Sequence, residues 1–186
     1  MTSRLNRLAV AFVATALATL GVTVANPSPA SAAMTICYNT SQAGSFAGTA
    51  NQAASIWNNA TSNLTLTANC GSNLRIYQIT GGGSYAVRTS LGNGRVYIDT
   101  QQAQQYSPLR IMTHEIGHIL GLPDNYNGNC ALLMSGGSAG TSCTNPYPST
   151  TEANRVTSLF AGTLSTNRAG SQIFRDSWPA ALTTVG

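Results

Sequence analysis

A short segment of the chain carries residue types and a spacing that suit metal-assisted hydrolysis: residues 114–118 read His-Glu-Ile-Gly-His. On a helix, residues four apart project from the same face, so the imidazoles of His114 and His118 can reach one ion. Glu115 would lie one step round the helix, where its carboxylate can contact a water bound to that ion. Zinc at such an open site lowers the pKa of its water to about 7, so a carboxylate can take a proton during attack on a peptide carbonyl. The pattern predicts His114 and His118 as zinc ligands and Glu115 as general base.

The alternative interpretation of this segment is a solvated helix face that carries two histidines and a glutamate by chance. Two observations oppose it. His114 and His118 are the only histidines of the chain. The surrounding positions have the apolar pattern of a buried helix: Ile111, Met112, Ile116, Ile119 and Leu120. Buried imidazoles beside a buried carboxylate need a strong partner, and a metal ion supplies one.

A third metal ligand can be sought among the acidic residues, because no histidine remains and the cysteines are expected to be oxidised. Asp124 follows His118 by six residues, with Gly121 halfway. A glycine there can adopt a left-handed conformation, end the helix and turn the chain back towards the metal. We therefore expect Asp124 to be the third ligand. Glu152, on a later helix, is the alternative.

The motif lies within a segment expected to form a helix. Ser107 and Pro108 are typical of an N-cap and a first helical residue, and Gly121 is typical of the residue that ends a helix. Ser149 with Glu152 three residues later resembles a capping box and predicts a further helix. The apolar side of that further helix would be formed by Ala153, Val156, Leu159 and Phe160.

Strand-like runs precede the motif. We expect a short strand at residues 35–38, an amphipathic helix at 45–59, and strands at 64–68, 74–80, 85–90 and 95–100. The short Gly-Asn-Gly loop at 92–94 predicts that the last two strands form an antiparallel hairpin. Peptides can add to the free edge of such a sheet, and residues 85–90 are expected to bind a substrate in this way.

The first 32 residues have the features of a signal peptide. Arg4 and Arg7 precede an apolar stretch at 8–24, and Ala-Ser-Ala at 30–32 is a small-residue cleavage site. A membrane anchor is the alternative, but the prolines and small residues after the stretch favour cleavage. Without this segment the formal charge of +4 falls to about +2, and charged residues make up only 8% of the chain. We therefore expect a secreted monomer, with no membrane attachment in its mature form and no nucleic-acid partner.

Four cysteines follow the expected leader: Cys37, Cys70, Cys130 and Cys143. An even number in an exported chain predicts two disulfides, for which the sequence allows three pairings. Closing two local loops would join Cys37 to Cys70 and Cys130 to Cys143. A four-cysteine zinc site is the competing interpretation, but it needs two close pairs and these spacings contain none.

The segment 114–124, His-Glu-Ile-Gly-His-Ile-Leu-Gly-Leu-Pro-Asp, resembles the long zinc motif of the metzincins, with an aspartate in place of the usual third histidine. Leu-Met-Ser at 133–135 resembles the Met-turn of that clan. The aspartate variant, the Asn-Tyr that follows it, Met-Ser-Gly-Gly at 134–137 and Ser-Cys-Thr-Asn-Pro-Tyr-Pro at 142–148 are similar to the snapalysin family. These are small neutral metalloproteinases secreted by streptomycetes, and the resemblance covers residues 35–162.

The resemblance implies an α+β protein with the metzincin fold, namely a twisted five-stranded mixed sheet, an active-site helix and a C-terminal helix. It also implies the Cys130–Cys143 disulfide, with Cys37–Cys70 as an additional bridge. Met134 is expected to pack beneath the metal as a structural residue.

The resemblance further implies a zinc endopeptidase that cleaves proteins or peptides before aromatic residues, at the P1′ position. Tyr126 lies where the family has a tyrosine suited to stabilising the oxyanion; a packing role in the loop is the alternative. The family's calcium site uses residues just before the active-site helix, where this chain has Ser-Pro-Leu at 107–109. An aspartate expected there is absent, so we do not expect a tightly bound calcium ion.

We thus expect a signal peptide at 1–32, a catalytic domain at 33–162 and a C-terminal extension at 163–186 that has no counterpart in the family. The alternatives to a peptidase are a secreted binding protein with a structural metal and a metal-dependent hydrolase of another substrate. Retention of Glu115 with three ligands favours catalysis. The extension carries Ile173, Phe174 and Trp178, which would either occupy an apolar pocket near the metal or dock on the surface.

Overall fold

The computed structural model describes residues 33–161 and 171–175. The expected signal peptide and most of the C-terminal extension, including Trp178, lie outside the described residues. None of the helices in the described ranges has the length and apolar composition that a membrane crossing requires.

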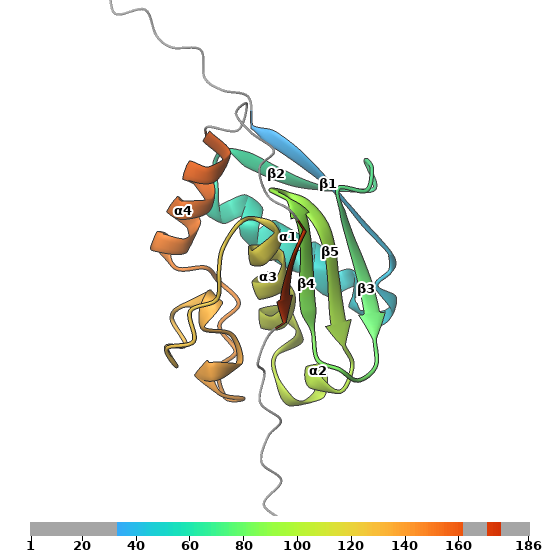
Figure 1. The fold of residues 1–186 in the computed structure, drawn as a ribbon, viewed down its shortest axis with the longest axis vertical. Coiled ribbons are helices and arrows are strands. Elements are labelled where there is room, and N and C mark those ends of the chain that lie inside the picture. Colours follow the sequence, from blue (N-terminus) through green and yellow to red (C-terminus); the bar gives the residue numbers. More distant parts are fainter. Residues whose placement is uncertain (1–32, 162–170, 176–186) are drawn as a thin grey trace, which may run out of the picture. The chain divides into compact units, whose positions relative to one another are not determined.

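A mixed β-sheet forms the centre of the fold (Figure 1). Its strands are β1 (Met34–Gln42), β2 (Leu64–Ala68), β3 (Leu74–Ile79), β4 (Tyr85–Ser90), β5 (Asn93–Asp99) and β6 (Gln172–Arg175), in the order β2-β1-β3-β5-β4-β6. Strands β1, β2, β3 and β5 are parallel, whereas β4 is antiparallel to both β5 and β6. The expected hairpin and the α+β class are confirmed. The sheet differs from the expected five strands by β6, which the C-terminal extension contributes.

Helices complete the architecture: α1 (Ala47–Ala60), α2 (Gln102–Gln105), α3 (Pro108–Ile119) and α4 (Thr150–Ala161), with 3-10 helices η1 (Gly44–Phe46) and η2 (Leu133–Ala139). The Ser107 side chain accepts a hydrogen bond from the N–H of Arg110, so α3 begins with the predicted cap. The predicted capping box is also present before α4, because Ser149 and Glu152 each accept a hydrogen bond from the other's backbone N–H.

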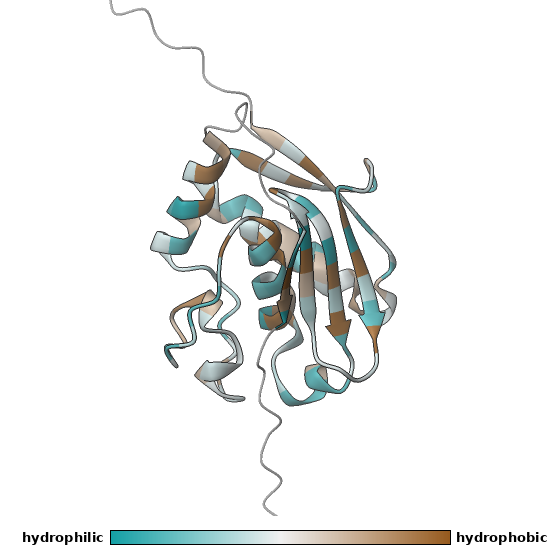
Figure 2. Cartoon of the chain, viewed as in Figure 1, coloured by the Kyte–Doolittle hydropathy of each residue, from teal (hydrophilic) through white to brown (hydrophobic). Residues whose placement is uncertain are grey.

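The apolar core lies where α1 and α3 pack against each other and against the sheet. Apolar and polar positions alternate along the strands, so that one face of the sheet supplies this core (Figure 2). Trp57 of α1 is fully buried, and its indole N–H donates to the Thr113 carbonyl of α3 at 2.9 Å. This bond fixes α1 against the middle of the helix that carries the histidine motif.

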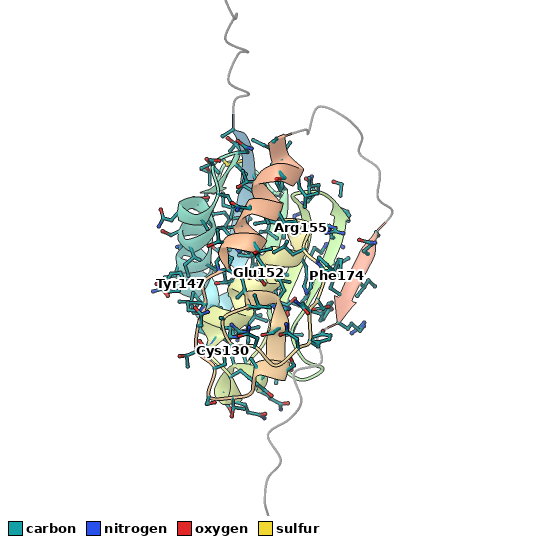
Figure 3. All side chains as sticks on the ribbon, turned by 90° about the vertical axis from the view of Figure 1, so that its left-hand side faces the viewer. Cys130, Tyr147, Glu152, Arg155 and Phe174 are labelled. Atoms are coloured by element: carbon teal, nitrogen blue, oxygen red, sulfur yellow. A yellow bond between two sulfur atoms is a disulfide. The ribbon has the colours of Figure 1, made fainter. Side chains whose placement is uncertain are left out.

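Both disulfides have the expected pairing. Cys37–Cys70 joins β1 to the loop after β2, and Cys130–Cys143 closes a loop that contains η2. The second bridge lies in the segment between α3 and α4 (Figure 3). It constrains a segment that is otherwise rich in glycine and asparagine.

Asp99, at the end of β5, organises the glycine-rich turn that leads into β4. Its buried carboxylate accepts hydrogen bonds from the N–H groups of Gly83 at 2.7 Å, Gln101 at 2.8 Å and Gly81 at 3.0 Å. Burial disfavours the charged form, but these bonds outweigh it and hold the pKa of Asp99 below its ordinary value. The turn is therefore stabilised by a carboxylate that must be ionised.

Replacing Asp99 with asparagine is expected to lower the free energy of unfolding by about 1–3 kcal/mol at pH 7. A carboxyl group with a lowered folded pKa contributes its stability above its unfolded pKa of about 4, and loses it as the pH falls through the folded value. The difference between wild type and variant should therefore shrink between pH 7 and pH 3 in urea unfolding. An equal difference at both pH values would contradict this role.

Candidate active site

Helix α3 brings the predicted histidines together. His114, Glu115 and His118 are all fully buried, and the Nε2 atoms of the two imidazoles lie 3.1 Å apart. The apolar residues on either side of the motif belong to the core, which holds the helix rigidly against the sheet. The expectation of a buried helix is confirmed.

Each imidazole is oriented through its other nitrogen. Nδ1 of His114 lies 2.9 Å from the carbonyl oxygen of Leu133, and Nδ1 of His118 lies 2.9 Å from that of Leu122. Because a carbonyl oxygen only accepts, each Nδ1 must carry the proton that it donates. The neutral form of each ring then directs the lone pair of Nε2 into the space that the two histidines share.

Asp124 joins the same space by means of a turn at Gly121. Gly121 has φ of 102°, a value that side chains other than glycine rarely adopt, and the backbone leaves the helix there. Beyond it, Oδ1 of Asp124 lies 3.3 Å from Nε2 of His114 and 3.2 Å from Nε2 of His118. The structure thus brings together the three residues that the sequence predicts as ligands.

The three potential ligand atoms of this cluster fit a zinc ion. One ligand atom from each of His114, His118 and Asp124 lies within 4.8 Å of the others. Oδ1 of Asp124 is buried and accepts no hydrogen bond from the described residues. Two imidazole nitrogens and a carboxylate oxygen are all acceptors, so a cation is the partner that satisfies them. Nitrogen and oxygen ligands in this number are typical of open zinc sites.

Glu152, the alternative metal ligand, binds backbone N–H groups outside the cluster. Its carboxylate accepts hydrogen bonds from the N–H groups of Leu133 at 3.1 Å, Met134 at 2.8 Å and Ser149 at 2.7 Å. It therefore links the start of α4 to η2, where Figure 3 labels it. The Leu133 carbonyl orients His114, and Glu152 binds the N–H of the same residue. Glu152 therefore supports the cluster indirectly and is not one of its ligands.

Arg110 is a supporting residue that the sequence analysis missed. It is buried on α3, and its guanidinium donates to the carbonyls of Asn145 at 2.6 Å and Leu132 at 2.9 Å and to Oγ of Ser135 at 3.0 Å. Burial lowers the pKa of Arg110, although the charge of Glu152 opposes this effect. The available signal was an arginine four residues before His114 within an otherwise apolar helix, which needs buried partners for its charge.

Met134 packs beneath the motif, as predicted. It is buried, and a Cβ atom at Gly117 would lie only 2.9 Å from its sulfur and 3.2 Å from Cζ2 of Trp57. The glycine between the two histidines therefore allows η2 and α1 to approach the helix closely.

Tyr126 lies in the loop after Asp124 with 45% of its surface exposed.

Sequence comparison agrees with this geometry. The model of the Streptomyces extracellular neutral proteinase (M7) family matches residues 33–163. The chain belongs to this family. The resemblance to the snapalysins is thereby confirmed, and the match extends over both the sheet strands β1–β5 and the cluster on α3.

Individual relatives show how far the likeness extends. The extracellular small neutral protease of Streptomyces lividans is 46% identical over 139 residues, which is 74% of this chain and 61% of the relative. That of Streptomyces caespitosus is 45% identical over 129 residues, 69% of this chain and 98% of the relative. That of Streptomyces coelicolor is 44% identical over 139 residues, which is 73% of this chain and 64% of the relative. The chain thus matches less than two thirds of two of these relatives and nearly all of the third.

Proposed function

We propose that this protein is a secreted zinc metalloendopeptidase, active as a monomer, with residues 33–162 as its catalytic domain. The convergence of the buried imidazoles of His114 and His118 with the buried Oδ1 atom of Asp124 is the observation that carries the proposal. Membership of a family of extracellular neutral proteinases supports the peptidase activity and the secretion. Proteins and peptides are accordingly its proposed substrates.

Each side chain has a distinct task in the proposed reaction. His114, His118 and Asp124 would hold one zinc ion, which when bound supplies a Lewis acid and an acidified water. Glu115 takes a proton from the attacking water and later transfers it to the leaving amine. The carbonyls of Leu133 and Leu122 keep both imidazoles in the tautomer that faces the ion.

Substrate binding is proposed to use two further features. Tyr126 is accessible, and its phenol can donate a hydrogen bond to the substrate carbonyl as negative charge develops there. An extended peptide would run along β4, since backbone groups of an edge strand can pair with it. By similarity to the family, we propose a preference for aromatic residues at P1′.

Metal removal tests the proposed function. The purified chain is expected to contain about one zinc ion by elemental analysis and to cleave unfolded casein. Chelation should abolish cleavage because the acceptors of the cluster then have no cation to polarise a water. Added Zn²⁺ should restore activity, and mass spectrometry of the products should find Phe and Tyr enriched at P1′.

The controls separate catalysis from a structural role of the metal. Circular dichroism should report whether the chelated protein remains folded, so that lost activity is not merely unfolding. Cleavage that continues unchanged in the folded, zinc-free protein would refute the proposal. One firmly bound zinc ion with no cleavage even at saturating substrate would instead favour a binding protein with a structural metal.

A further inference from the structure

Strand β6, which belongs to the C-terminal extension, occupies the sheet edge next to the cluster of His114, His118 and Asp124. Strand β6 pairs antiparallel with β4, with Ala86 opposite Phe174 and Arg88 opposite Gln172. In Figure 1, β6 is the dark red strand beside β4. Without β6, strand β4 would be the outermost strand on this side of the described sheet. The extension thus uses the same edge that the proposed function assigns to the substrate.

Phe174 reaches the cluster itself. Its ring stacks on the imidazole of His118, with ring centroids 4.4 Å apart and planes at 11°. The guanidinium carbon of Arg88 lies 4.9 Å from the centroid of the same ring. Phe174, which is labelled in Figure 3, therefore contacts both a proposed zinc ligand and a residue of the substrate strand.

Arg88 connects the extension to the end of the active-site helix. Its guanidinium donates to the His118 carbonyl at 2.8 Å and also to the side-chain oxygen of Gln172. At the other end of β6, the guanidinium of Arg175 lies over the ring of Tyr85 at 4.9 Å. Polar and aromatic contacts thus hold β6 at both ends, in addition to the backbone pairing.

We propose that Gln172–Arg175 is an intramolecular inhibitor that lies in the substrate position, so that the described conformation is closed to peptides. The inference rests on the proposed function, because it takes β4 as the substrate strand. A segment of the same chain meets β4 in an intramolecular step, so its effective concentration exceeds that of dilute substrate and it competes well. Opening requires β6 to leave β4 and Phe174 to leave His118.

Phe174→Ala in the full chain tests this inference. An occupant that competes with substrate raises the apparent KM and leaves kcat unchanged. We therefore expect the variant to lower KM for a short peptide by about tenfold, with equal kcat and equal zinc content, because a central aromatic contact is lost. A misfolded variant cannot produce this gain.

Ile173→Ala is the matched control. Ile173 lies on the same strand but is 58% exposed, so its truncation should change KM by less than about twofold. If Phe174→Ala leaves KM unchanged, or if both variants lower it equally, the inference is wrong.

Hydrogen exchange provides a test that does not depend on activity. Amides of β4 should exchange faster in Phe174→Ala than in wild type or Ile173→Ala, because loss of β6 exposes that edge. If neither wild type nor variant cleaves peptides while β4 is deprotected as expected, the proposed function fails and the occupancy of the edge stands. If both cleave with the same KM and β4 exchanges equally, the inference fails and the proposed function stands.

Discussion

Replacing Glu115 with glutamine is expected to lower kcat for peptide cleavage by roughly 10²–10⁴-fold while zinc content stays near one per chain. Glutamine has nearly the same size and shape, so the buried position beside His114 remains filled. Its amide cannot accept the proton of the attacking water or transfer it to the leaving amine. The comparison uses kcat at saturating substrate, since the inhibitory strand proposed above alters only KM.

Glu115→Asp is the conservative comparison for this experiment. It keeps a carboxylate but withdraws it by one methylene group, so we expect activity between wild type and Glu115→Gln. Near-normal turnover by Glu115→Gln would refute the general-base role. Loss of zinc together with loss of turnover would mean that Glu115 holds the site together and that its role is structural.

Local chemistry explains which parts of the site could be predicted from the sequence. The start of α3 depends on Ser107 and Pro108, and the turn after it depends on Gly121, so short-range rules were sufficient. The approach of Asp124 to the two histidines follows from that turn. The β4–β5 hairpin was equally local, because a short loop joins its strands.

The supporting contacts could not be predicted because they join segments far apart in the chain. Glu152 was recognised as a capping residue, but its bonds to Leu133 and Met134 depend on how the disulfide-closed loop returns to α3. Arg110 satisfies carbonyls of that same loop. Neither sequence spacing nor periodicity carries this information.

Strand β6 illustrates the same limit at the level of the fold. Ile173 and Phe174 identified the extension as able to bind an apolar site, which agrees with the stacking of Phe174 on His118. Four residues are too few for a periodic strand signal, and their pairing partner lies more than 80 residues earlier. The order of strands in a sheet is set by such long-range pairing.

Replacing Asp124 with alanine is expected to weaken zinc binding by more than about 100-fold, since even the loss of an outer hydrogen-bond partner of a ligand costs about 10–100-fold. The two imidazoles would retain their tautomers through Leu133 and Leu122, but the cluster would lose its only negative ligand. Asp124→His is expected to keep the metal, because imidazole can serve as the third ligand of an open zinc site. Competition with a chromogenic chelator measures the zinc affinities of the wild type, Asp124→Ala and Asp124→His.

Glu152→Ala distinguishes the proposed zinc ligand Asp124 from the supporting residue Glu152. Removing its carboxylate leaves the N–H groups of Leu133 and Met134 without their acceptor, which should lower the free energy of unfolding by about 1–3 kcal/mol. Zinc affinity of the folded variant should fall less than in Asp124→Ala, because Glu152 acts on His114 only through the Leu133 carbonyl. The opposite ranking of the two variants would place Glu152 at the metal and Asp124 outside it, and would contradict the site proposed for this chain.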